Sequence, residues 1–239
     1  MILGLETSHN SSTAILYFTR SVESEARRKS LIPNNYKKNK QVVKALIDHT
    51  KHVISNSGLT YYISNTDSDT LSFGEKLTRN IDYVFAQGHN SIIILGNDCP
   101  QLNEADINKA ADILLAGHDT YGRATDGGLY LIGLQQESYH KAIFEKLSWS
   151  DETLAEDLDK YLATYSREIH CVASSIKEDI DDDLDLISFI GQASKSCTLY
   201  HKIISILIDY TQPRVFELHI IHQNTHIKTA NLRGPPQAA

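Results

Sequence analysis

Cysteine and long apolar runs are both scarce in this chain of 239 residues, and each scarcity narrows the class of protein. Its three cysteines, Cys99, Cys171 and Cys197, have no paired spacing, which argues against a disulfide framework or structural zinc and favours a reducing compartment. No apolar run approaches the roughly eighteen residues of a membrane span, and the amino terminus has no charged-then-apolar leader. We therefore expect a soluble, cytoplasmic protein with no membrane span.

Positive charge is also scarce, because the formal net charge is -7. A nucleic-acid-binding protein needs a basic surface, so we expect no nucleic-acid partner. One local basic segment near the amino end is the exception and predicts a narrower role in binding an anion. Its members are Arg27, Arg28, Lys29, Lys37, Lys38 and Lys40.

Length and hydrophobic content favour one large α/β domain, since 41% of the residues are hydrophobic and can fill its core. We expect this domain to span residues 1–190. Residues 191–239 then form a carboxyl-terminal extension, and we expect its end, around Gly234-Pro235-Pro236, to be disordered.

Strand-like and helix-like segments alternate along the chain, which predicts a three-layer α/β/α sandwich with a mostly parallel, Rossmann-like sheet. Segment 203–208 fits a helix or a strand, and 215–222 is expected to be extended. The predicted strands are 13–18, 59–64, 91–95, 119–122 (a strand or a turn), 128–134 and 169–173, and the predicted helices are 41–57, 73–87, 107–116 and one that follows Trp149-Ser150-Asp151 and runs through Tyr161.

The most informative segment begins at Ser91-Ile92-Ile93-Ile94-Leu95, which is short, β-branched and uncharged. It predicts a central strand buried on both faces of a parallel sheet. Asp98 follows just past its carboxyl end, at the sheet edge where open α/β sheets bind ligands. A carboxylate there could hold a divalent metal, Mg²⁺ or Mn²⁺, that bridges a diphosphate.

A simpler interpretation of Asp98 is that it caps the following helix. Asn103 is the better cap, since Glu104 and Asp106 follow it in a first turn that favours acidic side chains. This leaves Asp98 available for another role. Gly96 lets the backbone pass close to a ligand, although any tight turn also accepts a glycine.

Five motifs stand in order along the chain: FGEKL, ILGNDCPQL, ATDGGLYLIGL, LSWS and DIDDDLDL. With these motifs the chain resembles the glycosyltransferase-A-like family of nucleotide-diphospho-sugar transferases over roughly residues 14–190. Within that family it resembles most the predicted glycosyltransferases associated with arsenosugar biosynthesis.

The resemblance implies a fold that binds a nucleotide diphosphate through a divalent metal. Asp98 matches the metal-binding acid of that fold, and Asp181 matches an acid that reaches the metal in related nucleotidyltransferases. Asp126, Gly127 and Gly128 match the segment that shapes the sugar or acceptor side of the pocket, and we expect Gly96 and Asn97 to contact substrate as well.

The chain departs from the family in two places. The family has a glycine-containing basic loop after the first strand, whereas here Phe18-Thr19-Arg20-Ser21 has no glycine. Arg20, Arg28 and Lys29 could still neutralise phosphate, although a solvated helix face is the simpler interpretation and the one we favour for Arg27. Arg123 stands where the family tends to place a proline, so it either adds an anion contact or spoils the pocket.

Other clusters are weaker candidates. The acidic run 178–185 fits either a solvated loop or a metal site built on Asp179-Ile180-Asp181. His49 and His52 have a helical spacing that could bind metal, but no third ligand accompanies them. His219, His222 and His226 would not share one face of an extended segment, so we interpret them as structural or incidental.

The predicted function is glycosyl transfer from a nucleotide-diphosphate sugar to an unidentified small-molecule acceptor. Asp98, with Asp181, would hold the metal, Arg20 and Lys29 would neutralise the diphosphate, and Asp126 would orient an acceptor hydroxyl or act as general base. Nucleotidyl transfer with release of pyrophosphate ranks second, because the glycine-rich loop is missing. A non-catalytic binding protein on the same fold is the third alternative, supported by the altered loop and Arg123.

Overall fold

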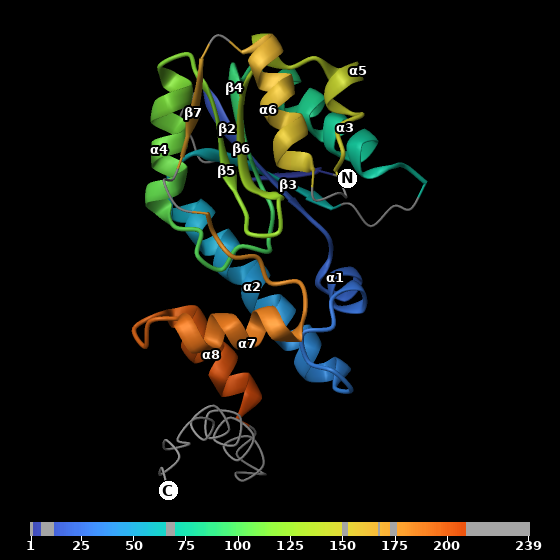
Figure 1. The fold of residues 1–239 in the computed structure, drawn as a ribbon, viewed down its shortest axis with the longest axis vertical. Helices are drawn as coiled ribbons and strands as arrows, with labels where there is room; N and C mark the ends of the chain where they lie inside the picture. The colour runs from blue at the N-terminus through green and yellow to red at the C-terminus, as the bar shows by residue number, and fades with distance from the viewer. Residues whose placement is uncertain are drawn as a thin grey trace, which may run out of the picture.

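The computed structural model describes residues 2–5, 12–65, 70–149, 153–166, 168–172 and 176–208. They build one seven-stranded sheet in the order β1-β3-β2-β4-β6-β5-β7 (Figure 1). The strands are β1 (Ile2–Leu5), β2 (Thr13–Thr19), β3 (Thr60–Asn65), β4 (Ser91–Leu95), β5 (Asp119–Arg123), β6 (Leu129–Gln135) and β7 (Ile169–Cys171).

Helices cover both faces of this sheet and make two separate hydrophobic clusters with it. One cluster packs α3, α5 and α6 on one face, and the other packs α1, α2, α4, α7 and α8 on the opposite side. The helices are α1 (Val22–Arg28), α2 (Tyr36–Asn56), α3 (Phe73–Ala86), α4 (Glu104–Leu115), α5 (Lys141–Phe144), α6 (Leu154–Tyr165), α7 (Asp183–Gln192) and α8 (Thr198–Leu207), with the short 3₁₀ turn η1 (Gln136–Ser138). The fold is the three-layer α/β/α sandwich that the alternation predicts.

The central strand β4 occupies the predicted residues and is buried along its whole length. The prediction of parallel neighbours on both sides is wrong: β4 pairs parallel with β2 and antiparallel with β6. The reason is the connection between β5 and β6, which is only residues 124–128. So short a link returns the chain antiparallel, whereas a parallel return needs a crossover. Five of the seven strands still share one direction.

Capping side chains decide where several helices begin. Asn103 caps α4 in a reciprocal capping box with Asp106, as the sequence predicts. Asn35 caps α2, which therefore begins five residues before the predicted start at 41. Asp182 caps α7, so the carboxyl half of the acidic run is the start of a helix and not a solvated loop.

Helix α8 packs on the main core, because Leu199 and Ile203 are buried in the cluster that contains α2. The division of the chain at residue 190 stays a prediction. The expected extended segment 215–222, His219, His222 and His226, and the Gly-Pro-Pro end lie outside the described residues. Within the described ranges, none of the helices combines the length and apolar character that a bilayer crossing would need.

Candidate functional site

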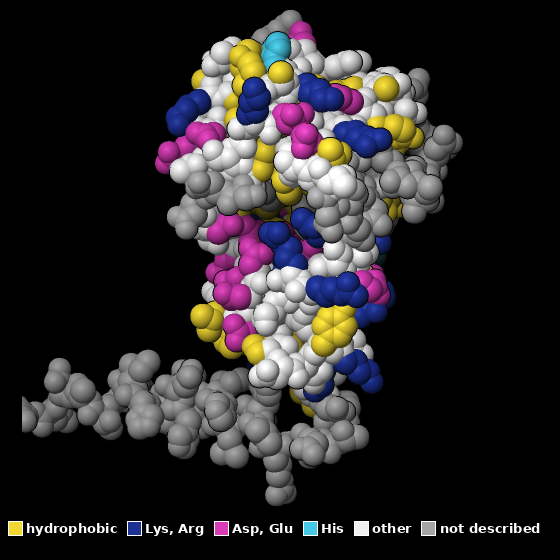
Figure 2. All heavy atoms as spheres, turned by 90° about the vertical axis from the view of Figure 1, so that its right-hand side faces the viewer, with side chains coloured by type: hydrophobic (Ala, Val, Ile, Leu, Met, Phe, Trp, Pro, Cys, Tyr) yellow, Lys and Arg dark blue, Asp and Glu magenta, His cyan; other side chains and the backbone are white. Residues whose placement is uncertain are grey.

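A cavity of about 630 Å³ opens at the carboxyl ends of β2 and β4. Three kinds of side chain line it: acids from the loops after β4 and β5 and from segment 179–181, bases from α1 and the turn before it, and apolar rings from α3 and the loop after α5. Figure 2 shows a hollow across the middle of one face, where Lys and Arg side chains lie beside Asp and Glu side chains.

Lys29 connects the basic and acidic walls. It follows the last turn of α1, its side chain is only 4% exposed, and its Nζ donates to Asp98 Oδ1 and to the carbonyl of Ile180 at 2.8 Å. Asp181 Oδ1 lies 2.9 Å from the same Nζ. Burial opposes the charge of Lys29, but the carboxylates of Asp98 and Asp181 outweigh it and raise the pKa of the amine.

Asn39 of α2 holds this lysine in place. Its Nδ2 donates to the carbonyls of Ala26 and Lys29, both at 2.7 Å, and its Oδ1 accepts from the amide of Leu31 at 2.8 Å. The side chain is buried, so it satisfies backbone groups that water cannot reach. Sequence reasoning did not identify Asn39, since an asparagine inside a helix carries no signal of the loop that it will contact.

Glu25 lies behind the basic wall, 3.9 Å from Arg20 Nε and 3.7 Å from Lys29 Nζ. Burial and the charge of Asp98 raise its pKa. Arg20 and Arg28 also line the cavity, so the structure brings together all three cations that the sequence analysis considered for phosphate.

The segment 177–181 reaches the site by backbone pairing with two other loops. Lys177 N donates to the carbonyl of Arg123 at 3.1 Å, and Thr125 N donates to the carbonyl of Lys177 at 2.9 Å. Further along, Ile180 N donates to the carbonyl of Asp98 at 2.9 Å. Ile180 is fully buried, and the acids on either side of it, Asp179 and Asp181, both line the cavity.

Asp98, Asp126, Asp179 and Asp181 therefore share one cavity. Burial, together with the charges of Asp126, Asp98 and Asp181 and a hydrogen bond with Asp126, raises the pKa of Asp179 to about 8. Burial is the largest of these causes and the neighbouring carboxylates add to it, so Asp179 keeps its proton more readily than a solvated acid does. Hard divalent cations prefer carboxylate oxygens, so the acids that line this cavity are donors suited to Mg²⁺ or Mn²⁺.

Asp126 is oriented by its own turn. Its Oδ1 accepts from the amide of Gly128 at 2.8 Å, and a Cβ on Gly128 would lie 2.9 Å from that oxygen, which is too close for another residue type without a shift. Gly127 adopts a φ of +87° and is not among the cavity-lining residues, so the structure places this predicted substrate-binding residue behind the turn.

The other predicted substrate-binding residues, Gly96 and Asn97, line the cavity. Arg123 does not: it pairs with Asp159 of α6, and its guanidinium lies over the ring of Tyr121 at 5.6 Å. The sequence analysis considered Asp179 only within the candidate metal site Asp179-Ile180-Asp181 and assigned the metal role to Asp181. The available signal was the Asp-Ile-Asp alternation, which in extended backbone places both acids on the face opposite Ile180.

An aromatic wall completes the cavity. The rings of Phe73 and Trp149 are stacked with centroids 5.6 Å apart, and Phe18 meets Phe73 edge-on at 5.2 Å. Gly74 makes this possible, because a Cβ there would lie 2.0 Å from the carbonyl oxygen of Glu145 and would push the loop that carries Trp149 away. Such a wall can contact a planar or apolar ring face.

Comparison with known proteins supports the fold. Residues 39–151 match a sequence family described as "Uncharacterized protein conserved in bacteria (DUF2064)". No curated protein matches the chain significantly.

Solved structures resemble this one over most of its length. A structure described as a "putative nucleotide-diphospho-sugar transferase" from Desulfovibrio desulfuricans G20 matches with a TM-score of 0.67 and 17% identity, covering 82% of this chain and 95% of that one. A Mycobacterium sp. strain JC1 homologue of a Mycobacterium tuberculosis protein matches with a TM-score of 0.48 and 10% identity, covering 83% and 98%. The inositol-1-phosphate CTP transferase from T. maritima matches with a TM-score of 0.41 and 12% identity, covering 82% and 98%.

The last two similarities are too weak to support an inference, and the first supports the fold alone. The arsenosugar-type subgroup stays a prediction. The chain has the nucleotide-diphospho-sugar transferase fold.

Proposed function

We propose that this protein transfers a glycosyl group from a nucleotide-diphosphate sugar to a small-molecule acceptor, with the help of a divalent cation. One observation carries the proposal: a single cavity at the carboxyl ends of β2 and β4 holds clustered acids, three cations and an aromatic wall. This is the sheet edge where open α/β sheets bind ligands.

Asp98 and Asp181 are the residues that would hold Mg²⁺ or Mn²⁺, with Asp179 close behind them. Their place in one cavity supports this assignment, because hard divalent cations prefer carboxylate oxygens as ligands. When bound, the cation would stabilise the charge that develops on the departing diphosphate.

Lys29 orients the acids. Its ammonium contacts Asp98 and Asp181 at once, and burial prevents it from moving freely in solvent. With Arg20 and Arg28 it also reduces the electrostatic cost of bringing a diphosphate into an acidic cavity. Arg20 and Lys29 both lie beside Glu25, and Arg20 is the more accessible of these two cations. Its side chain is 25% exposed, whereas that of Lys29 is 4% exposed.

Asp126 is positioned to receive the proton of an acceptor hydroxyl. The Gly128 amide donates to Asp126 Oδ1, which orients the carboxylate, and the acceptor hydroxyl would replace Asp179 as its hydrogen-bond partner. In the transfer, the acceptor oxygen forms a bond to the anomeric carbon and its proton passes to Asp126. The bond from that carbon to the diphosphate breaks, and the diphosphate leaves with the electron pair.

The loop after β2 favours a diphosphate donor over a triphosphate. Only Arg20 and Ser21 separate β2 from α1, neither is a glycine, and Ser21 Oγ is occupied in accepting from Ser24 N at 3.2 Å. A triphosphate held for attack on its α-phosphorus needs a concave loop of free amides. Nucleotidyl transfer therefore remains the second candidate.

The test measures ligand binding and products with nucleotide-diphosphate sugars and nucleoside triphosphates, each with and without Mn²⁺. We expect a larger rise in melting temperature with a nucleotide-diphosphate sugar and Mn²⁺, and release of nucleoside diphosphate when acceptors are added. Asp98→Asn should weaken Mn²⁺-dependent binding at least about 100-fold while the fold stays intact. The matched control is Asp112→Asn, which changes an exposed acid of α4.

Two outcomes would overturn the proposal. Release of pyrophosphate from a triphosphate, lost in Asp98→Asn, would establish nucleotidyl transfer instead. Absence of binding to either class of ligand would favour a non-catalytic protein on this fold.

A further inference from the structure

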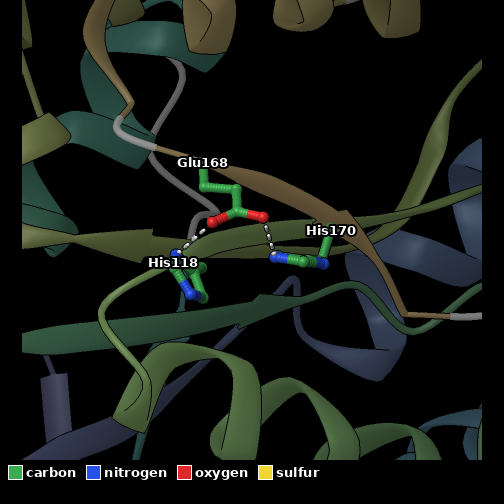
Figure 3. Close-up of side chains that lie close together, drawn as sticks. All are labelled: His118, Glu168 and His170. Carbon is green, nitrogen blue, oxygen red and sulfur yellow. Dashed lines mark ion pairs between the residues drawn. The ribbon is translucent and has the colours of Figure 1, made fainter.

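A second cluster of metal-binding side chains lies at the opposite edge of the sheet, away from the cavity. His118 lies between α4 and β5, Glu168 directly precedes β7, and His170 lies within β7 (Figure 3). One ligand atom from each residue lies within 4.8 Å of the other two. His118 Nδ1 is 3.5 Å from Glu168 Oε2, and His170 Nε2 is 3.2 Å from Glu168 Oε1.

Backbone structure fixes the position of all three residues. Helix α4 ends in a Schellman motif, in which Gly117 N donates to Leu114 O at 3.0 Å and His118 N donates to Ile113 O at 3.2 Å. Gly117 has the positive φ of +86° that this ending requires. His118 therefore leaves the helix in a defined direction.

Strand pairing fixes the other two ligands. β5 and β7 are parallel, with Asp119 opposite Ile169 and Thr120 opposite His170. Asp119 N donates to the carbonyl of Glu168 at 3.1 Å, and Thr120 Oγ1 donates to the carbonyl of His170 at 2.5 Å. The three ligand-bearing residues thus belong to two hydrogen-bonded strands and one helix end, which are rigid supports.

The two imidazole nitrogens that face Glu168 are buried without a hydrogen bond. His118 Nδ1 and His170 Nε2 have almost no solvent-exposed surface, although their side chains are 30% and 42% exposed, and neither has a hydrogen-bond partner within the described part of the chain. A buried polar atom without a partner is destabilising. A metal ion or a proton between these nitrogens and the Glu168 carboxylate would remove that cost.

We propose that His118, Glu168 and His170 bind a zinc-class divalent cation. Zinc bonds of about 2.1 Å in tetrahedral geometry place neighbouring ligand atoms about 3.4 Å apart. The separations of 3.5 Å and 3.2 Å, measured to the two different oxygens of Glu168, are close to that value. Two imidazoles and one carboxylate also form a donor set that zinc prefers, whereas Mg²⁺ prefers oxygen alone.

Protons are the competing occupants, since two imidazolium groups could pair with the one carboxylate. That arrangement places two positive charges on rings whose centroids are 4.9 Å apart, with a single negative charge between them. A metal binds both imidazoles in their neutral form and removes this repulsion.

The cation would stabilise the pairing of an edge strand, β7, with β5. β7 has only three residues and pairs with β5 alone, so few hydrogen bonds hold it. The metal would link His118, which lies outside β7, to Glu168 and His170, which lie just before β7 and within it. These bonds would resist separation of β5 and β7. Glu168 is 58% exposed, so water can complete the coordination. This site does not depend on the proposed glycosyl transfer.

The test titrates the metal-free full-length chain with Zn²⁺ against a chromophoric chelator. It compares wild type with His118→Ala, Glu168→Gln and the control His52→Ala, an exposed histidine of α2. We expect one tight site in wild type and in His52→Ala, and a loss of affinity of about 100-fold or more in His118→Ala. Co²⁺ should give the visible absorption of a tetrahedral N/O site in wild type and in His52→Ala, and not in His118→Ala.

Melting curves without metal establish that each variant folds, and Glu168→Gln preserves shape if His118→Ala does not fold. Tight Zn²⁺ binding that survives both His118→Ala and Glu168→Gln would overturn the proposal, as would its absence in wild type. Loss in His52→Ala alone would assign the site to another histidine cluster.

Discussion

The two edges of the sheet both gather side chains that can bind metal, but they do so with different chemistry. At the carboxyl ends of β2 and β4 the acids Asp98, Asp126, Asp179 and Asp181 surround a large cavity and contact a buried lysine. At the amino ends of β5 and β7 two histidines and one glutamate lie close together, and two buried imidazole nitrogens are the candidate metal ligands.

The two proposed sites suggest a division between the edges of one sheet. A cation at the acidic cavity would exchange with solvent, and a cation at the histidine cluster would stay bound. Oxygen ligands in an open cavity suit a hard ion that enters with its substrate, and Lys29 neutralises the acids in its absence. Imidazole ligands on hydrogen-bonded strands suit a borderline ion that stays bound. Single substitutions should affect one edge and leave the other unchanged.

Lys29→Met should have the largest effect. It leaves Asp98, Asp181 and the Ile180 carbonyl without their shared donor, and we expect a cost of about 2–3 kcal/mol in unfolding free energy, reduced by the partial exposure of both acids. Binding of nucleotide-diphosphate sugar should fall at least about 100-fold. Urea melts and calorimetry measure both, and Zn²⁺ affinity should not change.

The control for this lysine is Lys44→Met, which removes an exposed pair with Asp48 on α2. Its cost should be at most about 0.5 kcal/mol. Equal effects in the two variants would contradict the central role of Lys29.

Asn39→Ala should be nearly as destabilising, by about 2–3 kcal/mol, because it leaves the amides of Leu31 and Ile32 and the carbonyls of Ala26 and Lys29 without their partner. Since the loop carrying Lys29 would shift, nucleotide-sugar binding should weaken in the folded variant. Normal binding at a temperature where the variant is folded would show that Asn39 supports stability alone.

Gly117→Ala should affect the other edge. Its φ of +86° strains any residue with a Cβ, so we expect a loss of about 1 kcal/mol and a weaker Zn²⁺ site as His118 moves. Gly88→Ala is the matched control, since Gly88 follows α3 with a φ of +94° and, like Gly117, has no atom within 4 Å of an added Cβ. It should cost the same stability and leave Zn²⁺ affinity intact. Equal Zn²⁺ affinities in the two variants would argue against the site.

Glu25→Gln should have the smallest effect and appear only as a pH dependence. Burial raises the pKa of Glu25 above 4.5, so the folded protein holds this proton more tightly than the unfolded chain does. The stability from that proton is present below pH 4.5 and is lost as pH rises through the raised pKa. The variant lacks this loss, so its stability relative to wild type should increase with pH across that window.

The control is Glu23→Gln on the same helix, where the hydrogen bond and charge of Lys40 lower the pKa of Glu23. Its relative stability should change with pH in the opposite direction. Denaturant melts from pH 4 to pH 8 would distinguish the two slopes, and parallel slopes would contradict the burial of Glu25 as the cause.

Local signals predicted a large part of the fold and some of the site. The strand at Ser91–Leu95 and the Asn103 cap follow from apolar runs and from a side chain that bonds the nearest helix amides. These features depend on residues a few positions apart, so the sequence displays them directly. The acid after the central strand follows from the same local rule, which brings Asp98 to the carboxyl edge of the sheet.

The features that the sequence analysis did not predict depend on contacts between residues far apart in the sequence. Lys29 and Asp98 are 69 positions apart in the sequence and contact each other in the fold. No local sequence pattern predicts that the chain after α1 returns to the end of β4. Likewise β6 runs antiparallel because of its short connection to β5, and Arg123 turns toward Asp159 rather than toward the cavity.

Hydrophobic periodicity and capping act over one or two turns of chain, so the alternation of strands and helices and the Asn103 cap could be predicted from the sequence. The tertiary structure brings the acids into one cavity, joins them through Lys29, and places His118 beside Glu168 and His170. Those contacts depend on the order and register of strands, which bring together residues about 50 positions apart in the case of β5 and β7.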